Sequence, residues 1–104
     1  MNKYGNKRVV VDGIRFDSKR EAARWQELKL LERAGEIKGL ERQVEYELIP
    51  KQPGERAVKY IADFRYIDHD GKTVVEDTKG VKTPVYILKR KLLLWVHGIR
   101  VVEV

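Results

Sequence analysis

A short turn joins two strand-like segments in the second half of this 104-residue chain, and it limits the possible folds more than any other feature. Residues 59–67 and 73–79 are rich in β-branched and aromatic residues, and Asp68-His69-Asp70-Gly71 connects them. A three-residue loop with Gly71 in the left-handed conformation would make the numbers of paired residues sum to 140. Asp63 would then lie directly opposite Asp77, with β-carbons about 5 Å apart on one face of the hairpin.

Two carboxylates in this position need an explanation, because opposed like charges destabilise a sheet and burial makes the cost larger. A divalent cation would compensate, and Mg²⁺ or Mn²⁺ takes carboxylate oxygens together with water and phosphate. Lys79 lies two residues beyond Asp77, where an ammonium group could orient a water molecule or neutralise a phosphate oxygen. The alternative is an Asp–Lys pair on the solvent-facing side of an ordinary hairpin, and a register shift of one residue would separate the aspartates.

The remaining segments predict a single α+β domain over residues 1–104, with a mixed central sheet flanked by helices and residues 1–7 flexible. Turn and capping signals set the limits of each segment, such as Asp12-Gly13 in a hairpin and Thr83-Pro84 at a helix start. The expected elements are a hairpin over 9–16, a helix over 17–35, strands over 40–49, 59–67 and 73–79, a helix over 83–98 and a strand over 99–104. The predicted order is therefore β-hairpin-α-β-β-β-α-β.

Apolar residues at helical spacing predict the faces that the two helices bury. In the first helix these are Ala22, Trp25, Leu28 and Leu31, with Leu30 and Ala34 widening the stripe. In the second helix they are Val85, Leu88, Leu92 and Trp95. Both tryptophans are accordingly expected in the core and not as platforms for base stacking.

Charge and cysteine content restrict the possible partners and metal sites. The formal charge is +6, and it divides into +4 over residues 1–35, −2 over 36–81 and +4 over 82–104. Basic ends around an acidic middle fit a carboxylate site flanked by surfaces that attract phosphate, although three solvated faces would give the same numbers. The absence of cysteine excludes disulfides and thiolate zinc sites. With no signal peptide or membrane-spanning run in view, we expect a cytoplasmic protein without membrane contact.

The arrangement of Asp63 and Asp77-Thr78-Lys79 on adjacent strands, within this element order, resembles the PD-(D/E)xK nuclease superfamily. The chain is most similar to a small phage and prophage family of unknown function related to Holliday-junction-resolvase-like endonucleases. The similarity runs through residues 13–21, 35–37, 43–48, 62–64, 76–80 and 89–92. Ala62 replaces the proline of the motif's name and leaves the carboxylate in place. The resemblance implies a restriction-endonuclease-like core and a metal site formed by Asp63, Asp77 and the backbone carbonyl of Thr78.

The resemblance also implies that Glu21 of the first helix is a catalytic residue and a metal ligand. The residues themselves offer another interpretation, because Ser18 and Glu21 form an S-x-x-E capping box in which the glutamate reaches back to the cap amide. Gln43 corresponds to a glutamine that some members place beside the metal, but it can equally be a solvated residue of the strand. Glu76 could replace Asp77 only if a bulge reversed the alternation of side chains.

The function implied is that of an Mg²⁺- or Mn²⁺-dependent deoxyribonuclease that cuts branched or junction DNA during phage recombination, repair or DNA processing. The expected partner is DNA, the expected assembly is a homodimer formed through the N-terminal hairpin or an edge strand, and no small-molecule cofactor is expected. The alternative is a phage nucleic-acid-binding module without catalysis. The residues expected to contact DNA are Lys19, Arg20, Lys82, Lys89, Arg90 and Lys91.

Overall fold

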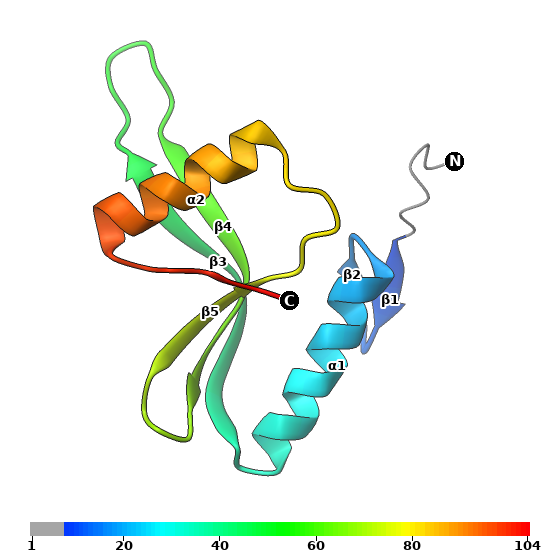
Figure 1. The fold of residues 1–104 in the computed structure, drawn as a ribbon. Helices are drawn as coiled ribbons and strands as arrows, with labels where there is room; N and C mark the ends of the chain where they lie inside the picture. The colour runs from blue at the N-terminus through cyan, green and yellow to red at the C-terminus, as the bar shows by residue number, and fades with distance from the viewer. Residues whose placement is uncertain (1–7) are drawn as a thin grey trace.

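The computed structural model describes residues 8–104 and has two helices, a small hairpin and a four-stranded sheet (Figure 1). Its elements are β1 (Val9–Val11), β2 (Ile14–Phe16), α1 (Lys19–Arg33), β3 (Ile37–Ile49), β4 (Val58–Asp68), β5 (Thr73–Asp77), α2 (Pro84–His97) and β6 (Val102–Glu103). The α+β class and the predicted element order are confirmed. The predicted flexibility of residues 1–7 lies outside the described residues.

The main sheet has the strand order β3-β4-β5-β6, in which only β5 and β6 pair in parallel. The hairpin β1-β2 is separate from it and turns through Asp12 and Gly13, both of which have positive φ, as its sequence predicts. In Figure 1, α1 lies beside the β1-β2 hairpin, whereas α2 crosses the far half of the β3-β4 pair. Within residues 8–104, neither helix is long and apolar enough to span a lipid bilayer.

The register of the β4-β5 hairpin agrees with the prediction. Its partners include Phe64 with Glu76 and Ile67 with Thr73, and these pairs both sum to 140. Gly71 has φ +81°, and the Asp68 amide donates a hydrogen bond of 2.8 Å to the carbonyl of Lys72 to close the loop. The residue type at one turn position therefore determines which side chains meet at the other end of the hairpin.

Helix α1 begins and ends as its local sequence predicts. Ser18 caps the first turn, and Gly35, with φ +80°, closes the last turn through a Schellman pair of hydrogen bonds. Ala22, Trp25 and Leu28 are buried as expected, whereas the prediction was wrong for three residues, Leu30, Leu31 and Ala34, which are exposed. Three residues of an α-helix turn through only about 300°, so each step of three rotates the side chain by about 60° relative to the previous one. Repeated steps of three therefore carry the predicted stripe away from the core and towards solvent.

Helix α2 is rotated relative to the predicted stripe. Its buried side chain is Leu93, with Tyr86 half-buried on the same face, while Val85, Leu88 and Trp95 are exposed and the prediction that they face the core was wrong. Tyr86 and Leu93 are seven residues apart, so they share a face that packs against a cluster from the sheet. Trp95 follows Leu93 by about 200° of helical rotation and therefore points away from that cluster.

The buried apolar residues form two clusters that share strand β4. Phe64 and Tyr66 pack with α1, whereas Tyr60 and Ala62 pack with Leu93 of α2. The change between the clusters falls at Asp63, opposite an exposed residue of β3 that has φ +54°, Gln43. Thus α1 packs against one half of β4 and α2 packs against the other half, and Asp63 lies where the two halves meet.

A buried ion pair joins α1 to β5. The Arg24 guanidinium donates two hydrogen bonds, of 2.8 and 2.7 Å, to the carboxylate of Glu76, which also accepts one from the Tyr66 hydroxyl. The Glu76 side chain is 1% exposed, so the charge depends on these donors for its stabilisation.

Replacing Arg24 by Met is expected to lower the free energy of unfolding by about 3–5 kcal/mol, because it leaves a buried carboxylate without its cation. The double variant Arg24→Met/Glu76→Gln should recover much of that loss, since the buried charge is then absent. Urea denaturation followed by circular dichroism measures both, with Arg33→Ala, at an exposed position of α1, as the control. Equal stability of Arg24→Met and the control would contradict the assigned role of the pair.

Candidate functional site

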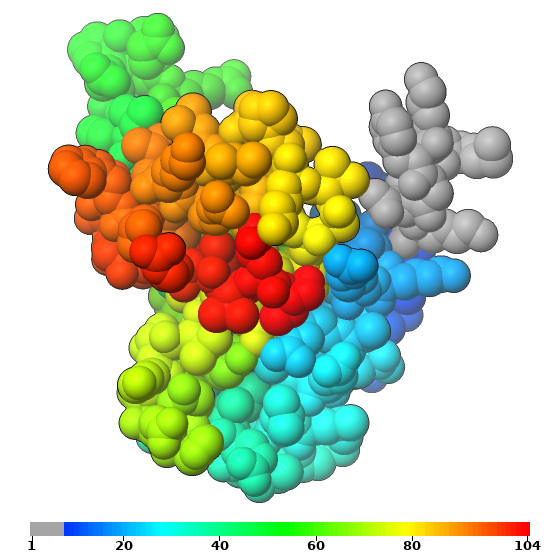
Figure 2. All heavy atoms as spheres, in the orientation of Figure 1, coloured from blue at the N-terminus to red at the C-terminus, as the bar shows by residue number. Residues whose placement is uncertain are grey.

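A cleft of about 740 Å³ opens between the start of α1, the middle of β4 and the segment that follows β5. On the face shown in Figure 2, residues of this segment (yellow) and the start of α1 (blue) lie close to one another. The lining residues that carry chemistry include Arg20, Glu21, Asp63, Thr78 and Lys79, with Asp17 just before α1 as a further carboxylate. Four of the predicted site residues therefore share one cavity, together with a residue predicted to contact DNA.

Asp63 is fixed in the cleft by the residue that follows β5. The backbone amide and the hydroxyl of Thr78 both donate hydrogen bonds of 2.9 Å to Asp63 Oδ2. Asp63 is only 9% exposed, so these two donors take the place of water at its Oδ2. Thr78 thus orients the carboxylate, a role that the sequence does not indicate.

Glu21 turns its carboxylate towards the cleft and not towards the helix cap. Its backbone amide donates to Ser18 Oγ at 3.1 Å, but within residues 8–104 the Ser18 amide donates no hydrogen bond back to the Glu21 carboxylate. Burial, followed by the nearby charge of Asp63, raises the pKa of Glu21 to about 7, and Arg42, 3.8 Å away, opposes the shift. The capping box is only half formed, which leaves the carboxylate available in the cleft.

Asp77 lies behind Asp63 and is 1% exposed. Its Oδ1 accepts a hydrogen bond of 3.0 Å from the Asp63 amide, and its Oδ2 accepts one from the Tyr60 hydroxyl. Burial raises the pKa of Asp77 to about 6, although Lys79 and the Asp63 amide act in the opposite direction. The two aspartates are therefore joined through a backbone amide, as their opposed register predicts.

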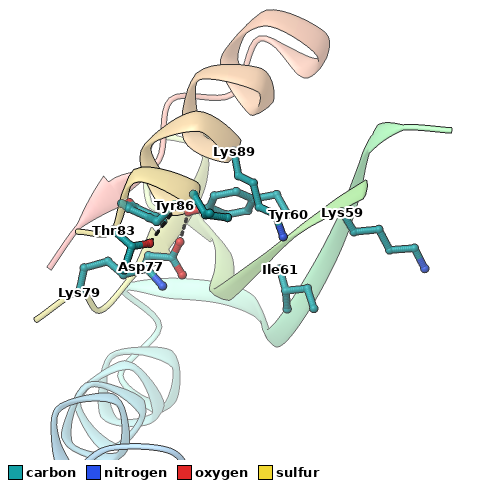
Figure 3. Close-up of a pocket in the computed structure, with 9 residues that line it drawn as sticks. Lys59, Tyr60, Ile61, Asp77, Lys79, Thr83, Tyr86 and Lys89 are labelled. Atoms are coloured by element: carbon teal, nitrogen blue, oxygen red, sulfur yellow. Dashed lines mark hydrogen bonds between the residues drawn. The ribbon is translucent and has the colours of Figure 1, made fainter. Parts of the chain in front are cut away.

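A second pocket, of about 280 Å³, lies on the other side of Asp77, and Figure 3 shows its lining. Lys89 extends into it from α2, whereas Lys59 points away. Tyr60 is 3% exposed and holds Asp77 here, a contribution that sequence reasoning missed. The available signal was a tyrosine three residues before Asp63 in a buried strand, which does not by itself identify a hydrogen-bonding partner.

Lys79 lines both cavities and links them. Its ammonium lies 4.8 Å from the centre of the Tyr86 ring, and its positive charge lowers the pKa of Asp77 against the effect of burial. Arg20 donates a hydrogen bond of 3.0 Å to the Lys79 carbonyl and so ties the segment after β5 to α1. The lysine of the predicted motif is thus placed beside the carboxylates.

Two predicted accessory residues lie apart from this cleft. Glu76 points to the opposite face, where Arg24 and Tyr66 bind it, so no bulge exchanges it with Asp77. Gln43 lies opposite Asp63 on β3 with an exposed side chain, and it lines neither of the two cavities. Over residues 8–104, no three His, Cys, Asp or Glu side chains are already arranged around one point in the manner of a metal site.

The residues predicted to contact DNA divide into two groups. Lys82 and Arg90 are paired with Glu103, at 3.1 and 3.4 Å. The others lie at a cavity or on the exposed surface, namely Arg20, Lys89, Lys19 and Lys91. Of the second group, Arg20 lines the cleft that holds Glu21 and Asp63, and Lys89 lines the pocket that holds Asp77.

The fold and the cleft define an α+β protein in which buried carboxylates lie beside a lysine on adjacent strands. The chain belongs to the family described as "Protein of unknown function (DUF1064)", whose model matches residues 1–98. No curated protein and no solved structure matches the chain.

The raised pKa values of Glu21 and Asp77 predict how the stability of the metal-free protein depends on pH. Both groups bind protons more tightly in the folded state than in the unfolded state. The free energy of unfolding should therefore fall as pH rises from the unfolded-state pKa values near 4 to the folded-state values of about 6 for Asp77 and about 7 for Glu21. Replacing Glu21 by Gln removes its share, on the order of 2 kcal/mol between pH 5 and 8.

Urea denaturation in EDTA at pH 5 and pH 8 measures the difference between wild type and Glu21→Gln. The matched control is Glu36→Gln, because Glu36 is exposed and follows the same helix. An identical pH dependence in wild type and Glu21→Gln would show that the Glu21 carboxyl does not carry the shifted titration.

Proposed function

We propose that this protein is a metal-dependent DNA endonuclease that hydrolyses phosphodiester bonds by PD-(D/E)xK chemistry. The observation that carries the proposal is the shared cleft of Glu21, Asp63 and Lys79, with Asp77 hydrogen-bonded directly behind Asp63. Asp77 at the end of β5, opposite Asp63, and Lys79 two residues further along the chain have the spacing of the motif of that superfamily.

The charge balance of the cleft supports a divalent cation. Glu21 and Asp63 face the same cavity, and the negative charge of Asp63 helps to raise the pKa of Glu21. Arg42 approaches Glu21 only to 3.8 Å and does not fully offset the repulsion between the Glu21 and Asp63 carboxylates. Protonation of Glu21 relieves that repulsion, and a bound cation would relieve it in the same way. Carboxylate oxygens are the ligands that Mg²⁺ and Mn²⁺ prefer. Asp63 and Glu21 would hold the ion, with Asp77 and the Thr78 carbonyl completing the site.

A bound Mg²⁺ would make a water molecule more acidic and neutralise charge on the phosphate. The chain's own residues supply orientation. Thr78 fixes Asp63 through two hydrogen bonds, and Tyr60 fixes Asp77 through one. The Lys79 ammonium would orient the attacking water or bind a phosphate oxygen, since it lies between the two cavities.

Cations at the rims of the cavities would bind the DNA backbone. Arg20 lines the cleft and Lys89 lines the neighbouring pocket, while Lys19 and Lys91 are exposed nearby along their helices. Contacts of this kind bind phosphate without reading sequence, which favours selection of branched or junction DNA by shape. We place this activity in the cytoplasm of the host cell of a phage, in a homodimer that cuts two strands.

Cleavage of labelled branched and linear DNA in Mg²⁺ or Mn²⁺ tests the proposal. Asp77→Asn and Lys79→Ala should each lower the rate by about 10²-fold or more, because Asp77 would help to hold the ion and Lys79 would stabilise negative charge that develops on the phosphate. Asp70→Asn is the matched control, since Asp70 lies exposed in the turn between the same two strands.

Calorimetric titration of wild type, Asp63→Asn and Asp70→Asn with Mn²⁺ separates binding of the ion from catalysis. Asp63→Asn should weaken binding of the ion, whereas Asp70→Asn should not. DNA that is bound but never cut in either metal would instead support the nucleic-acid-binding module. Undiminished cleavage by Asp77→Asn would remove the assigned active site.

A further inference from the structure

Helix α2 carries an apolar face that the rest of the described chain leaves uncovered. Trp95 is 86% exposed, Val85 62% and Leu88 59%, and Leu92 between them is half-buried. Contiguous exposed apolar side chains are uncommon on a monomer and mark sites of interaction. Tyr86 and Leu93 form the core-facing side of the helix, and Leu92 also packs partly against that cluster. Val85, Leu88 and Trp95 are therefore the residues of this face that hold no part of α2 on the described sheet.

The spacing of these residues specifies the shape of the partner. Val85, Leu88, Leu92 and Trp95 are separated by three, four and three residues. This is the a/d pattern of a coiled-coil seam, which is narrower than the face a helix usually buries against a sheet. A second helix lying along α2 would cover Val85, Leu88 and Trp95, together with the part of Leu92 that the sheet leaves exposed.

The charges beside the seam indicate the charge that a partner helix would carry. With Val85 at position a, Lys89 falls at e and Lys91 at g, so both edges are basic. No acidic residue occurs anywhere in Pro84–His97. A second copy of α2 would add further lysines along the same edges, and like charges in such positions disfavour pairing. An acidic amphipathic helix would be complementary on both edges.

The seam is continuous with the pocket beside Asp77. Val85 and Lys89 line that pocket together with Ile61, which is 51% exposed. A helix bound on α2 would therefore reach the edge of the site without covering the cleft of Asp63, which lies on the other side of Lys79.

We propose that the Val85-Leu88-Leu92-Trp95 face of α2 binds an acidic amphipathic helix of another protein. The proposal holds whether or not the cleft cuts DNA, because it rests on the exposed seam. Lys89 and Lys91 would pair with the acidic helix when it is bound and with the DNA backbone only when it is absent. Such a partner would lie beside the pocket that Val85 and Lys89 line together with Asp77.

The probe is a synthetic three-heptad peptide with Leu at a and d and Glu at e and g. Trp25 is buried and Trp95 exposed, so the fluorescence of Trp95 should respond to the peptide with a saturable blue shift. Leu88→Glu should weaken binding about tenfold or more, because it places a charge at the centre of the seam and opposite the acidic edges. Leu30→Glu, at an exposed leucine of α1, should bind as wild type does.

A matched peptide with Lys at e and g is expected not to bind. Equal binding of the two peptides would overturn the charge argument, and failure of the acidic peptide to shift Trp95 would overturn the proposal. Sedimentation of the free protein as a dimer that Leu88→Glu dissociates would assign the seam to a second copy. A shift produced by phosphatidylglycerol vesicles but not by the acidic peptide would assign it to a lipid surface.

Discussion

Hydrogen bonds exchanged between the middle of β4 and the end of β5 hold together two carboxylates that would otherwise repel each other. The Asp63 amide donates to Asp77, and the Thr78 amide and hydroxyl donate to Asp63. The backbone thus supplies the positive dipoles that make opposed aspartates tolerable in a buried position. The cleft, the raised pKa of Glu21 and the position of Lys79 all depend on this arrangement.

Features that depend on a few neighbouring residues were predictable from the sequence. Gly71 closes a three-residue loop, so the register that places Asp63 opposite Asp77 follows from the turn alone. The caps at Ser18 and Thr83 follow from local hydrogen-bonding chemistry in the same way. These local rules were enough to give the element order and the residues at the centre of the candidate site.

Features that depend on how elements pack were not predictable. The apolar residues of α2 occur all round the helix, so periodicity could not distinguish the stripe through Trp95 from the face of Leu93 that meets the sheet. The direction of the Glu21 carboxylate depends on Arg42 and Asp63, which come from two different strands. The hydroxyl of Tyr60 reaches Asp77 only because β4 and β5 are adjacent.

The change of packing partner along β4 has a consequence for folding. Glu21 stands on a helix that belongs to one apolar cluster, whereas Tyr60, the partner of Asp77, belongs to the other. The candidate site therefore draws on both clusters of the interior, Glu21 through one and Asp77 through the other. A ligand that contacts residues supported by both clusters would stabilise their packing together by its binding free energy. The two clusters would then unfold together more cooperatively when the ligand is bound.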